Sequence, residues 1–131
     1  MIISFAYTTP ALLAGAKSVT RRDWQPEYAR LAISRSPLLK TPRVHDAYDK
    51  SPRNGGRKVA TIQVLSLTQE PIASMPDSDY EAEGFAWLHA NGHVPPKSSG
   101  FPDFSFATFE RWRQSGATLY VVRFELVRVL A

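Results

Sequence analysis

The segment that most constrains the fold is 118–127, Thr-Leu-Tyr-Val-Val-Arg-Phe-Glu-Leu-Val. Its apolar and polar residues alternate along much of its length, and successive side chains of a strand point to opposite faces. The pattern therefore predicts a β-strand with one buried face. A half-buried strand must belong to a sheet that covers a hydrophobic core.

Three further segments have strand patterns. Residues 2–7 predict a first strand, residues 43–48 a second, and residues 58–67 a long central strand. The Asn54-Gly55 pair between the last two favours a hairpin turn. These strands and the final one supply the sheet.

Proline, glycine and hydroxyl residues mark the limits of the predicted helices. The sequence predicts a helix at 10–14, one within 24–36 that Pro37 ends, one from Ser78 to Gly92, and one from Asp103 or Ser105 to near Gly116. The order of strand, helix, strands, helices and strand indicates an α+β fold with a mostly antiparallel sheet that can close on itself.

Two features of the 78–92 helix are unusual. Ser78 and Glu81 have the spacing of a capping box, in which each side chain bonds the other residue's backbone amide. Gly84 lies inside the helix, where glycine costs about 1 kcal/mol relative to alanine, so we expect a neighbouring group to approach its backbone closely there. Glu83 has no such local explanation, and it is either a functional carboxylate or a surface glutamate near a helix N-terminus.

Polar residues cluster directly behind the first predicted helix, in Ala16-Lys17-Ser18-Val19-Thr20-Arg21-Arg22. Gly15 ends the helix, and residues 18–22 continue as an extended segment. Alternation then places Val19 in the core and leaves Ser18, Thr20 and Arg22 on the other face, with room for a ligand. An ordinary solvated basic turn is the alternative interpretation.

Length and composition limit the possible functions. The 131 residues, 44% of them hydrophobic, are enough for a single domain over 1–131. Because the chain has no cysteine, it holds no disulfide, no cysteine-based zinc site and no thiol nucleophile, and it suits the cytoplasm. No apolar run approaches the roughly 20 residues of a membrane span, and no signal peptide is evident. His89 and His93 are four residues apart, but Gly92 separates them, so we predict neither a metal site nor a cofactor.

Positive charge is concentrated in the first half of the chain. Residues 17–58 hold eleven Lys or Arg and four Asp or Glu, whereas the remaining residues hold five and eight. A basic region of this kind favours a polyanion such as nucleic acid, although a solvated basic face is the alternative. Within it, an insert at about 25–57 carries most of the basic stretch, namely Arg35, Lys40, Arg43, Lys50, Arg53, Arg57 and Lys58.

Three pieces of the chain resemble the ASCH domain family of the PUA-like superfamily. They are Ala14-Gly15-Ala16-Lys17-Ser18-Val19-Thr20-Arg21-Arg22, Glu83-Gly84-Phe85, and Val121-Val122-Arg123-Phe124-Glu125. The resemblance implies a small, mostly antiparallel β-barrel flanked by short helices. It also implies a cleft beside the lysine-containing turn that acts on RNA or modified nucleosides.

One branch of that family hydrolyses N4-acetylcytidine to cytidine and acetate, and Lys17, Thr20 and Glu83 match its pattern. The resemblance implies that Thr20 is the nucleophile, that Lys17 is its base, and that Glu83 is an acid/base or orienting group. A threonine hydroxyl needs such a base, and a buried lysine with a lowered pKa can act as one. The residues expected to bind substrate are Tyr7, Ser18, Arg21, Arg22 and Trp24.

The sequence leaves a second function open. An RNA-binding module or a single-stranded ribonuclease would use the same cleft together with the basic stretch for phosphate contacts. In either case the partner is a modified nucleoside or RNA, and no membrane is involved. The oligomeric state is not predicted.

Overall fold

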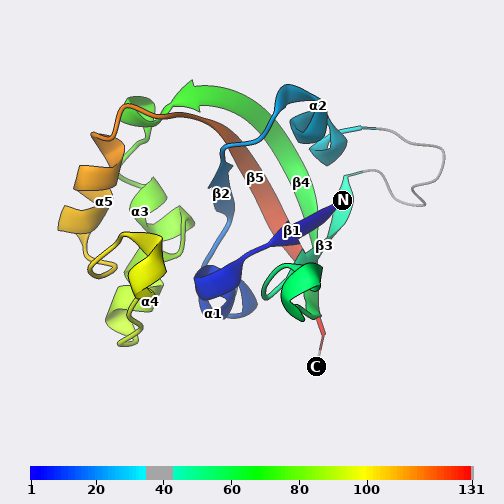
Figure 1. Ribbon diagram of the computed structural model, residues 1–131, viewed down its shortest axis with the longest axis horizontal. Coiled ribbons are helices and arrows are strands. Elements are labelled where there is room, and N and C mark those ends of the chain that lie inside the picture. The colour runs from blue at the N-terminus through cyan, green and yellow to red at the C-terminus, as the bar shows by residue number, and fades with distance from the viewer. Residues whose placement is uncertain (35–42, 131) are drawn as a thin grey trace.

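The computed structural model describes residues 1–34 and 43–130 (Figure 1). The strands are β1 (Ile2–Ser4), β2 (Val19–Arg22), β3 (Val44–Tyr48), β4 (Lys58–Pro71) and β5 (Thr118–Val129). The α-helices are α1 (Thr9–Leu13), α2 (Pro26–Ala29), α3 (Asp79–Ala82), α4 (Phe85–Ala90) and α5 (Phe106–Arg113). Short 3₁₀ turns lie at Ala6–Thr8, Arg30–Ala32, Pro52–Asn54, Ile72–Ser74 and Lys97–Ser99.

The five strands form one sheet in the order β1-β3-β4-β5-β2, and only the β1–β3 pair is parallel. The predicted α+β class with a mostly antiparallel sheet is therefore confirmed. The predicted closed barrel is wrong, because β1 and β2 are opposite edges of the sheet. A side chain spans the gap between them: Arg22 Nη2 donates a 2.7 Å hydrogen bond to the carbonyl oxygen of Ser4.

The long strands β4 and β5 pair along most of their length and curve together over the molecule (Figure 1). Their register shifts at Thr61/Ile62 and again between Val64 and Ser66. Each irregularity bends a strand and increases its twist. The curved pair runs from the helices α3–α5 at one end of the molecule to β1 and β3 at the other (Figure 1).

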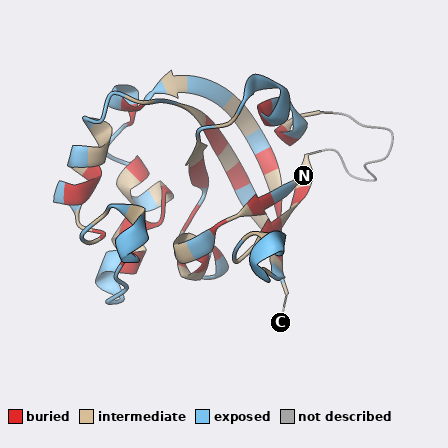
Figure 2. Ribbon diagram, viewed as in Figure 1, coloured by how far each residue is buried: buried red, intermediate tan, exposed pale blue. Residues whose placement is uncertain are grey.

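The hydrophobic core has two main parts (Figure 2). The sheet part contains Ile3, Phe5, Leu12, Ala47, Ala60, Ile62 and Phe124. The helical part contains Ala11, Ile72, Met75, Phe85, Leu88, Phe104 and Phe109. Helix α1 contributes Leu12 to the first and Ala11 to the second, so it joins the two parts.

Several predicted elements differ from the observed ones. The first strand ends at Ser4, and a 3₁₀ turn occupies Ala6–Thr8. The predicted helix within 24–36 is α2 followed by the turn Arg30–Ala32, and Pro37 lies outside the described residues. The 78–92 helix is divided into α3 and α4 at Gly84.

The predicted capping box is wrong. Ser78 has helical backbone angles (φ −60°, ψ −20°) and its side chain makes no capping hydrogen bond. A capping serine normally has extended angles that aim its oxygen at the helix amides. By contrast, Ser105 is extended and its side chain accepts a hydrogen bond from the Thr108 amide, so the Ser105 alternative for the last helix start is confirmed.

Among the described residues, no helix has the length and apolarity needed to cross a membrane. In the same part of the chain, no group of three or more His, Asp or Glu side chains is arranged to hold a metal ion.

His45 is buried and bonds the N-terminal nitrogen through Nδ1 and the Ala32 carbonyl through Nε2, both at 2.9 Å.

Candidate active site

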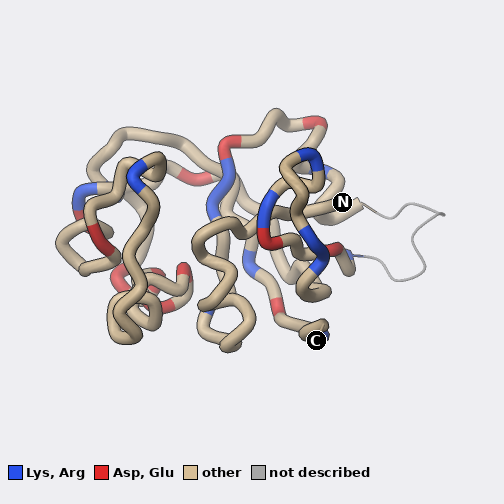
Figure 3. Tube along the Cα trace, turned by 60° about the horizontal axis from the view of Figure 1, so that its bottom comes forward, with Lys and Arg blue, Asp and Glu red and all other residues tan. Residues whose placement is uncertain are grey.

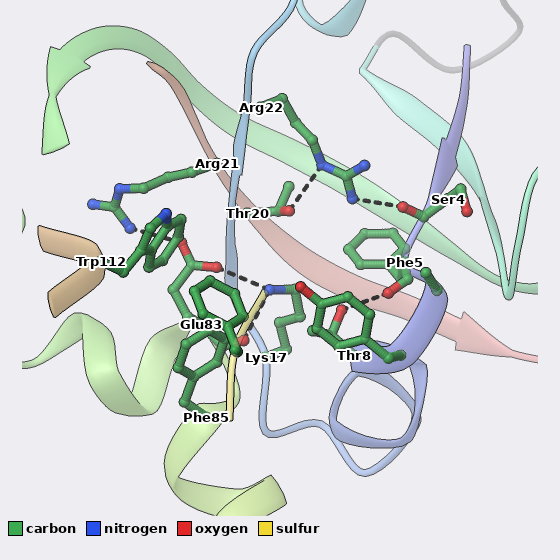
Figure 4. A pocket seen from close by; sticks show the side chains of 13 residues that line it. Ser4, Phe5, Thr8, Lys17, Thr20, Arg21, Arg22, Glu83, Phe85 and Trp112 are labelled. Carbon is green, nitrogen blue, oxygen red and sulfur yellow. Dashed lines mark hydrogen bonds and ion pairs between the residues drawn. The ribbon is translucent and has the colours of Figure 1, made fainter. Parts of the chain in front are cut away.

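A cavity of about 210 Å³ lies beside β2, between the sheet part and the helical part of the core (Figure 4). Six of the eight predicted site residues line it: Tyr7, Lys17, Thr20, Arg21, Arg22 and Glu83. Ser4, Phe5, Ala6, Thr8, Phe85, Phe101 and Trp112 complete its wall. The structure thus brings the three predicted catalytic residues to one cavity. Lys17 and Thr20 belong to one segment, and Glu83 lies more than sixty residues further along the chain.

The chain reaches this cavity through a tight turn after α1. Gly15 has φ +74°, a left-handed angle that glycine adopts without the steric penalty of a side chain. The following residues reverse direction and enter β2, where Thr20 is paired with Val122 of β5. Val19 is fully buried in the core, as predicted, while Thr20 lines the cavity at 4% exposure.

The second glycine, Gly84, brings the α3–α4 junction against this turn. It has φ +90°, and a Cβ added there would lie 2.7 Å from the Ala11 Cβ and 3.3 Å from the Lys17 Cβ. The predicted close approach to the Gly84 backbone is therefore confirmed, and the groups that approach it are the Ala11 and Lys17 side chains. The neighbouring Glu83 is placed beside Lys17 by this contact.

Lys17 and Glu83 form a buried ion pair (Figure 4). Lys17 Nζ donates to Glu83 Oε1 at 3.0 Å and to the Glu83 carbonyl oxygen at 2.8 Å. Arg21 Nη1 donates to the other carboxylate oxygen at 2.8 Å. The surface-glutamate interpretation of Glu83 is wrong, since its side chain is only 4% exposed and both its oxygens bond cations.

Burial lowers the pKa of Lys17 below the ordinary 10.5, even though Glu83 acts in the opposite direction. The positive charges of Arg22 and Arg21 lower it further. Water stabilises an ammonium far better than this cavity does. A neutral amine at Lys17 is therefore reached at a lower pH than on an exposed lysine.

Sequence reasoning missed Asp79, which is 2% exposed and anchors the cationic residues. Arg21 Nη2 bonds it at 2.5 Å, and Arg123 bonds its two oxygens at 3.1 and 3.0 Å. Burial alone would raise the pKa of this carboxyl, but the Arg123 and Arg21 hydrogen bonds outweigh burial and lower the pKa below 3.8. The available signal was its position four residues before Glu83, which puts both carboxylates on one helical face.

Thr20 has a cationic neighbour of its own. Arg22 Nε donates a 3.0 Å hydrogen bond to Thr20 Oγ1. The same guanidinium bonds Ser4 and lies 5.4 Å from the centre of the Phe5 ring, so three contacts hold it. A hydroxyl that accepts this bond keeps its own proton available for a base, and the adjacent positive charge favours the deprotonated oxygen.

Aromatic rings form the apolar wall of the cavity. Phe85 lies against Trp112 at 5.8 Å between ring centres, and Phe101 lies against Trp112 at the same distance. Tyr7 stacks on Phe104 at 6.0 Å, and burial raises the pKa of its hydroxyl, which stays protonated at neutral pH. Such a wall suits a flat, weakly polar group.

Two predicted substrate-binding residues do not line this cavity. Ser18 has an exposed side chain, and its backbone bonds the Ala82 carbonyl and the Phe124 amide, so it joins β2 to α3 and β5. Trp24 lies at a neighbouring cavity and packs edge-on against Tyr28. Alternation placed Ser18 on the face of Thr20, but β2 begins only at Val19, so the alternation does not extend to Ser18.

Comparison with known proteins gives information on the fold. No family model matches the chain, and no curated protein gives a significant sequence match, so the ASCH resemblance stays a prediction. Among solved structures, the chain is similar to the crystal structure of protein EF3133 from Enterococcus faecalis, which carries the family designation DUF984. The TM-score is 0.51 at 15% sequence identity, and the match covers 96% of this chain and 73% of the other. At this identity the similarity establishes a shared fold and nothing about activity.

Proposed function

We propose that the protein is an amidohydrolase that converts N4-acylated cytosine nucleosides, such as N4-acetylcytidine, to cytidine and a carboxylate. The observation that carries the proposal is the arrangement of Lys17, Thr20 and Glu83 at one cavity, with the lysine amine buried and its pKa lowered. A hydroxyl, a base whose neutral form is accessible, and a carboxylate that holds the base are the parts that acyl transfer to a side chain requires.

In the first step, Thr20 Oγ1 attacks the acyl carbon while its proton passes to the neutral amine of Lys17. The acyl oxygen takes up the negative charge of the tetrahedral intermediate. The Arg22 guanidinium, whose Nε already lies 3.0 Å from Thr20 Oγ1, is a cation placed to stabilise that charge. Donors fixed in place before the reaction are the most effective stabilisers of such an oxyanion.

In the second step, the bond between the acyl carbon and N4 breaks, and its electron pair stays on N4. The Lys17 ammonium gives N4 a proton, cytidine leaves, and the acyl group remains as an ester on Thr20. Water then attacks the ester, Lys17 accepts a proton from the water, and that proton returns to Thr20 as the carboxylic acid departs and loses its own proton to solvent. Throughout, Glu83 holds the Lys17 nitrogen through a 3.0 Å bond to its carboxylate.

The size and walls of the cavity support a planar substrate group. Its volume of about 210 Å³ lies below the roughly 300–1,000 Å³ of cavities that enclose drug-sized ligands. A cytosine ring with a short acyl group suits it better than a whole nucleotide. Phe85 and Trp112 offer flat apolar surfaces to such a ring.

The test is incubation of N4-acetylcytidine with the protein, followed by chromatography for cytidine. We expect cytidine from the wild type, none from Lys17→Met or Thr20→Val, and a rate at least about 100-fold lower from Glu83→Gln. Ser18→Ala is the matched control, because Ser18 belongs to the same motif but its exposed side chain lies outside the cavity. Absence of cytidine from the wild type would reject the activity, and normal turnover by Thr20→Val would reject the nucleophile.

The second candidate function, an RNA-binding module or ribonuclease, is favoured by the distribution of charge. Lys50, Arg53, Arg57 and Lys58 are exposed around the turn between β3 and β4, and Figure 3 shows further basic residues along β2. Arg35 and Lys40 of the basic stretch lie outside the described residues. Salt separates the candidates, since phosphate contacts weaken steeply with rising salt while turnover of a neutral nucleoside does not.

A further inference from the structure

A second cavity, of about 300 Å³, adjoins the candidate active site. Two residues, Ser4 and Arg22, line both cavities. The Arg22 guanidinium therefore lies where the two cavities meet, held by its bonds to Thr20 and to the Ser4 carbonyl. A ligand that extended out of the active site past Arg22 would enter the second cavity.

The walls of the second cavity combine two aromatic rings with an edge strand of the sheet. Trp24 and Tyr28 line it with ring centres 5.4 Å apart and planes at 80°. The residues of β1, an edge strand of the sheet, also line it. Tyr28 is 42% exposed, and its hydroxyl donates a long 3.4 Å bond to the Ile2 carbonyl. A large aromatic ring that is this exposed retains surface on which another ring can stack.

The junction of the two cavities is positively charged, because Arg22 lines both. Arg22 carries five N–H donors, of which the bonds to Thr20 and Ser4 use two. Ser51 lines the cavity, and the exposed Lys50 and Arg53 flank it in sequence. An anion that joins two flat groups, one in each cavity, matches this arrangement, because Arg binds phosphate through paired N–H donors.

We propose that the second cavity binds the nucleoside adjacent to the acylated cytidine, so that the substrate is single-stranded RNA rather than a free nucleoside. The neighbouring base stacks on the exposed ring of Tyr28, with the perpendicular Trp24 ring at its edge, and the phosphodiester between the two nucleosides lies at Arg22. This inference rests on the proposed function of the first cavity. Aromatic stacking with an adjacent cation is the usual way in which proteins hold single-stranded nucleic acid.

The first experiment compares kcat/KM for N4-acetylcytidine with kcat/KM for dinucleotides in which it is joined to uridine on its 5′ or its 3′ side. One stacked base is worth about 5- to 100-fold, so we expect the better dinucleotide to exceed the nucleoside by about that factor. In Tyr28→Ala the ratio of the two kcat/KM values should fall toward one. Leu31→Ala is the matched control, because Leu31 is 44% exposed and close in sequence but does not line the cavity, and its ratio should equal that of the wild type.

The second experiment measures binding without turnover, using the fluorescence anisotropy of a labelled pentauridylate. We expect Tyr28→Ala to weaken binding about 5- to 100-fold and Leu31→Ala to leave it unchanged. Equal dinucleotide and nucleoside rates, with equal binding by wild type and Tyr28→Ala, would overturn the inference while deacylation stood. Binding that depends on Tyr28, without hydrolysis of any substrate, would overturn the proposed function but support the second cavity as a nucleotide site.

Discussion

Gly84→Ala is the substitution whose effect follows most directly from the geometry. A left-handed backbone angle costs a residue other than glycine about 1–2 kcal/mol, and Gly84 has φ +90°. The added methyl would also lie 2.7 Å from the Ala11 Cβ in the core, and overpacking of that kind costs about 1–3 kcal/mol. The two effects together predict a loss of about 2–5 kcal/mol in the free energy of unfolding, measured by urea titration.

Gly92→Ala separates the two contributions. Gly92 also has a left-handed angle, φ +75°, but among the described residues no atom beyond its immediate chain neighbours lies within 4 Å of the position that a Cβ would take. It should therefore lose only the backbone contribution of about 1–2 kcal/mol. The gain from a less flexible unfolded chain is the same for both variants and cancels in the comparison. Equal losses in the two variants would refute the close packing of the α3–α4 junction against α1.

Three further predictions concern the buried charges and the core. Arg123 and Arg21 lower the pKa of Asp79 below 3.8, so the ionised carboxylate stabilises the folded state fully above that pH and progressively less as the pH falls through the pKa of the folded state. Below about pH 4, the urea midpoint of the wild type should therefore drop more steeply than that of Asp79→Asn. Parallel curves for the two proteins would contradict this. Phe124→Ala should cost about 3–5 kcal/mol, whereas Val127→Ala on the exposed part of the same strand should change stability by less than about 0.5 kcal/mol; a melting curve that Phe124→Ala leaves unmoved would remove that ring from the core. Because burial lowers the pKa of Lys17, turnover that uses its neutral amine should rise with pH and level off below pH 10.5, and a kcat/KM profile that falls over this range would exclude Lys17 as the base.

Local pattern was sufficient for much of the fold. The alternation in β4 and β5 and the proline and glycine around α1 depend on backbone geometry within a few residues, so a single sequence reveals them. Local pattern could not show whether the sheet closes into a barrel. Whether β1 and β2 pair depends on the curvature of the strands between them, and these edges remain joined by Arg22 instead.

Some residues of the candidate site could likewise be identified from the sequence, and others only from the structure. Its lysine, threonine and glutamate were identified from their spacing and from a family resemblance, and the structure places all three at one cavity. Asp79 was missed because its partner Arg123 lies 44 residues away, and ion pairs over such distances follow from packing rather than from local pattern. Ser18 was misplaced because alternation was extended one residue beyond the start of β2.

The sequence alone determined the approximate positions of most helices and strands, where the polar motif lies, and that Gly84 needs a close neighbour. These properties follow from the preferences of neighbouring residues and from periodicity. Only the tertiary structure decided that Lys17 is buried, that Glu83 and Asp79 share the cations of β2 and β5, and that a second cavity meets the first at Arg22. Burial and charge pairing depend on which surfaces come together when the chain folds, and that is a property of the whole chain rather than of any one segment.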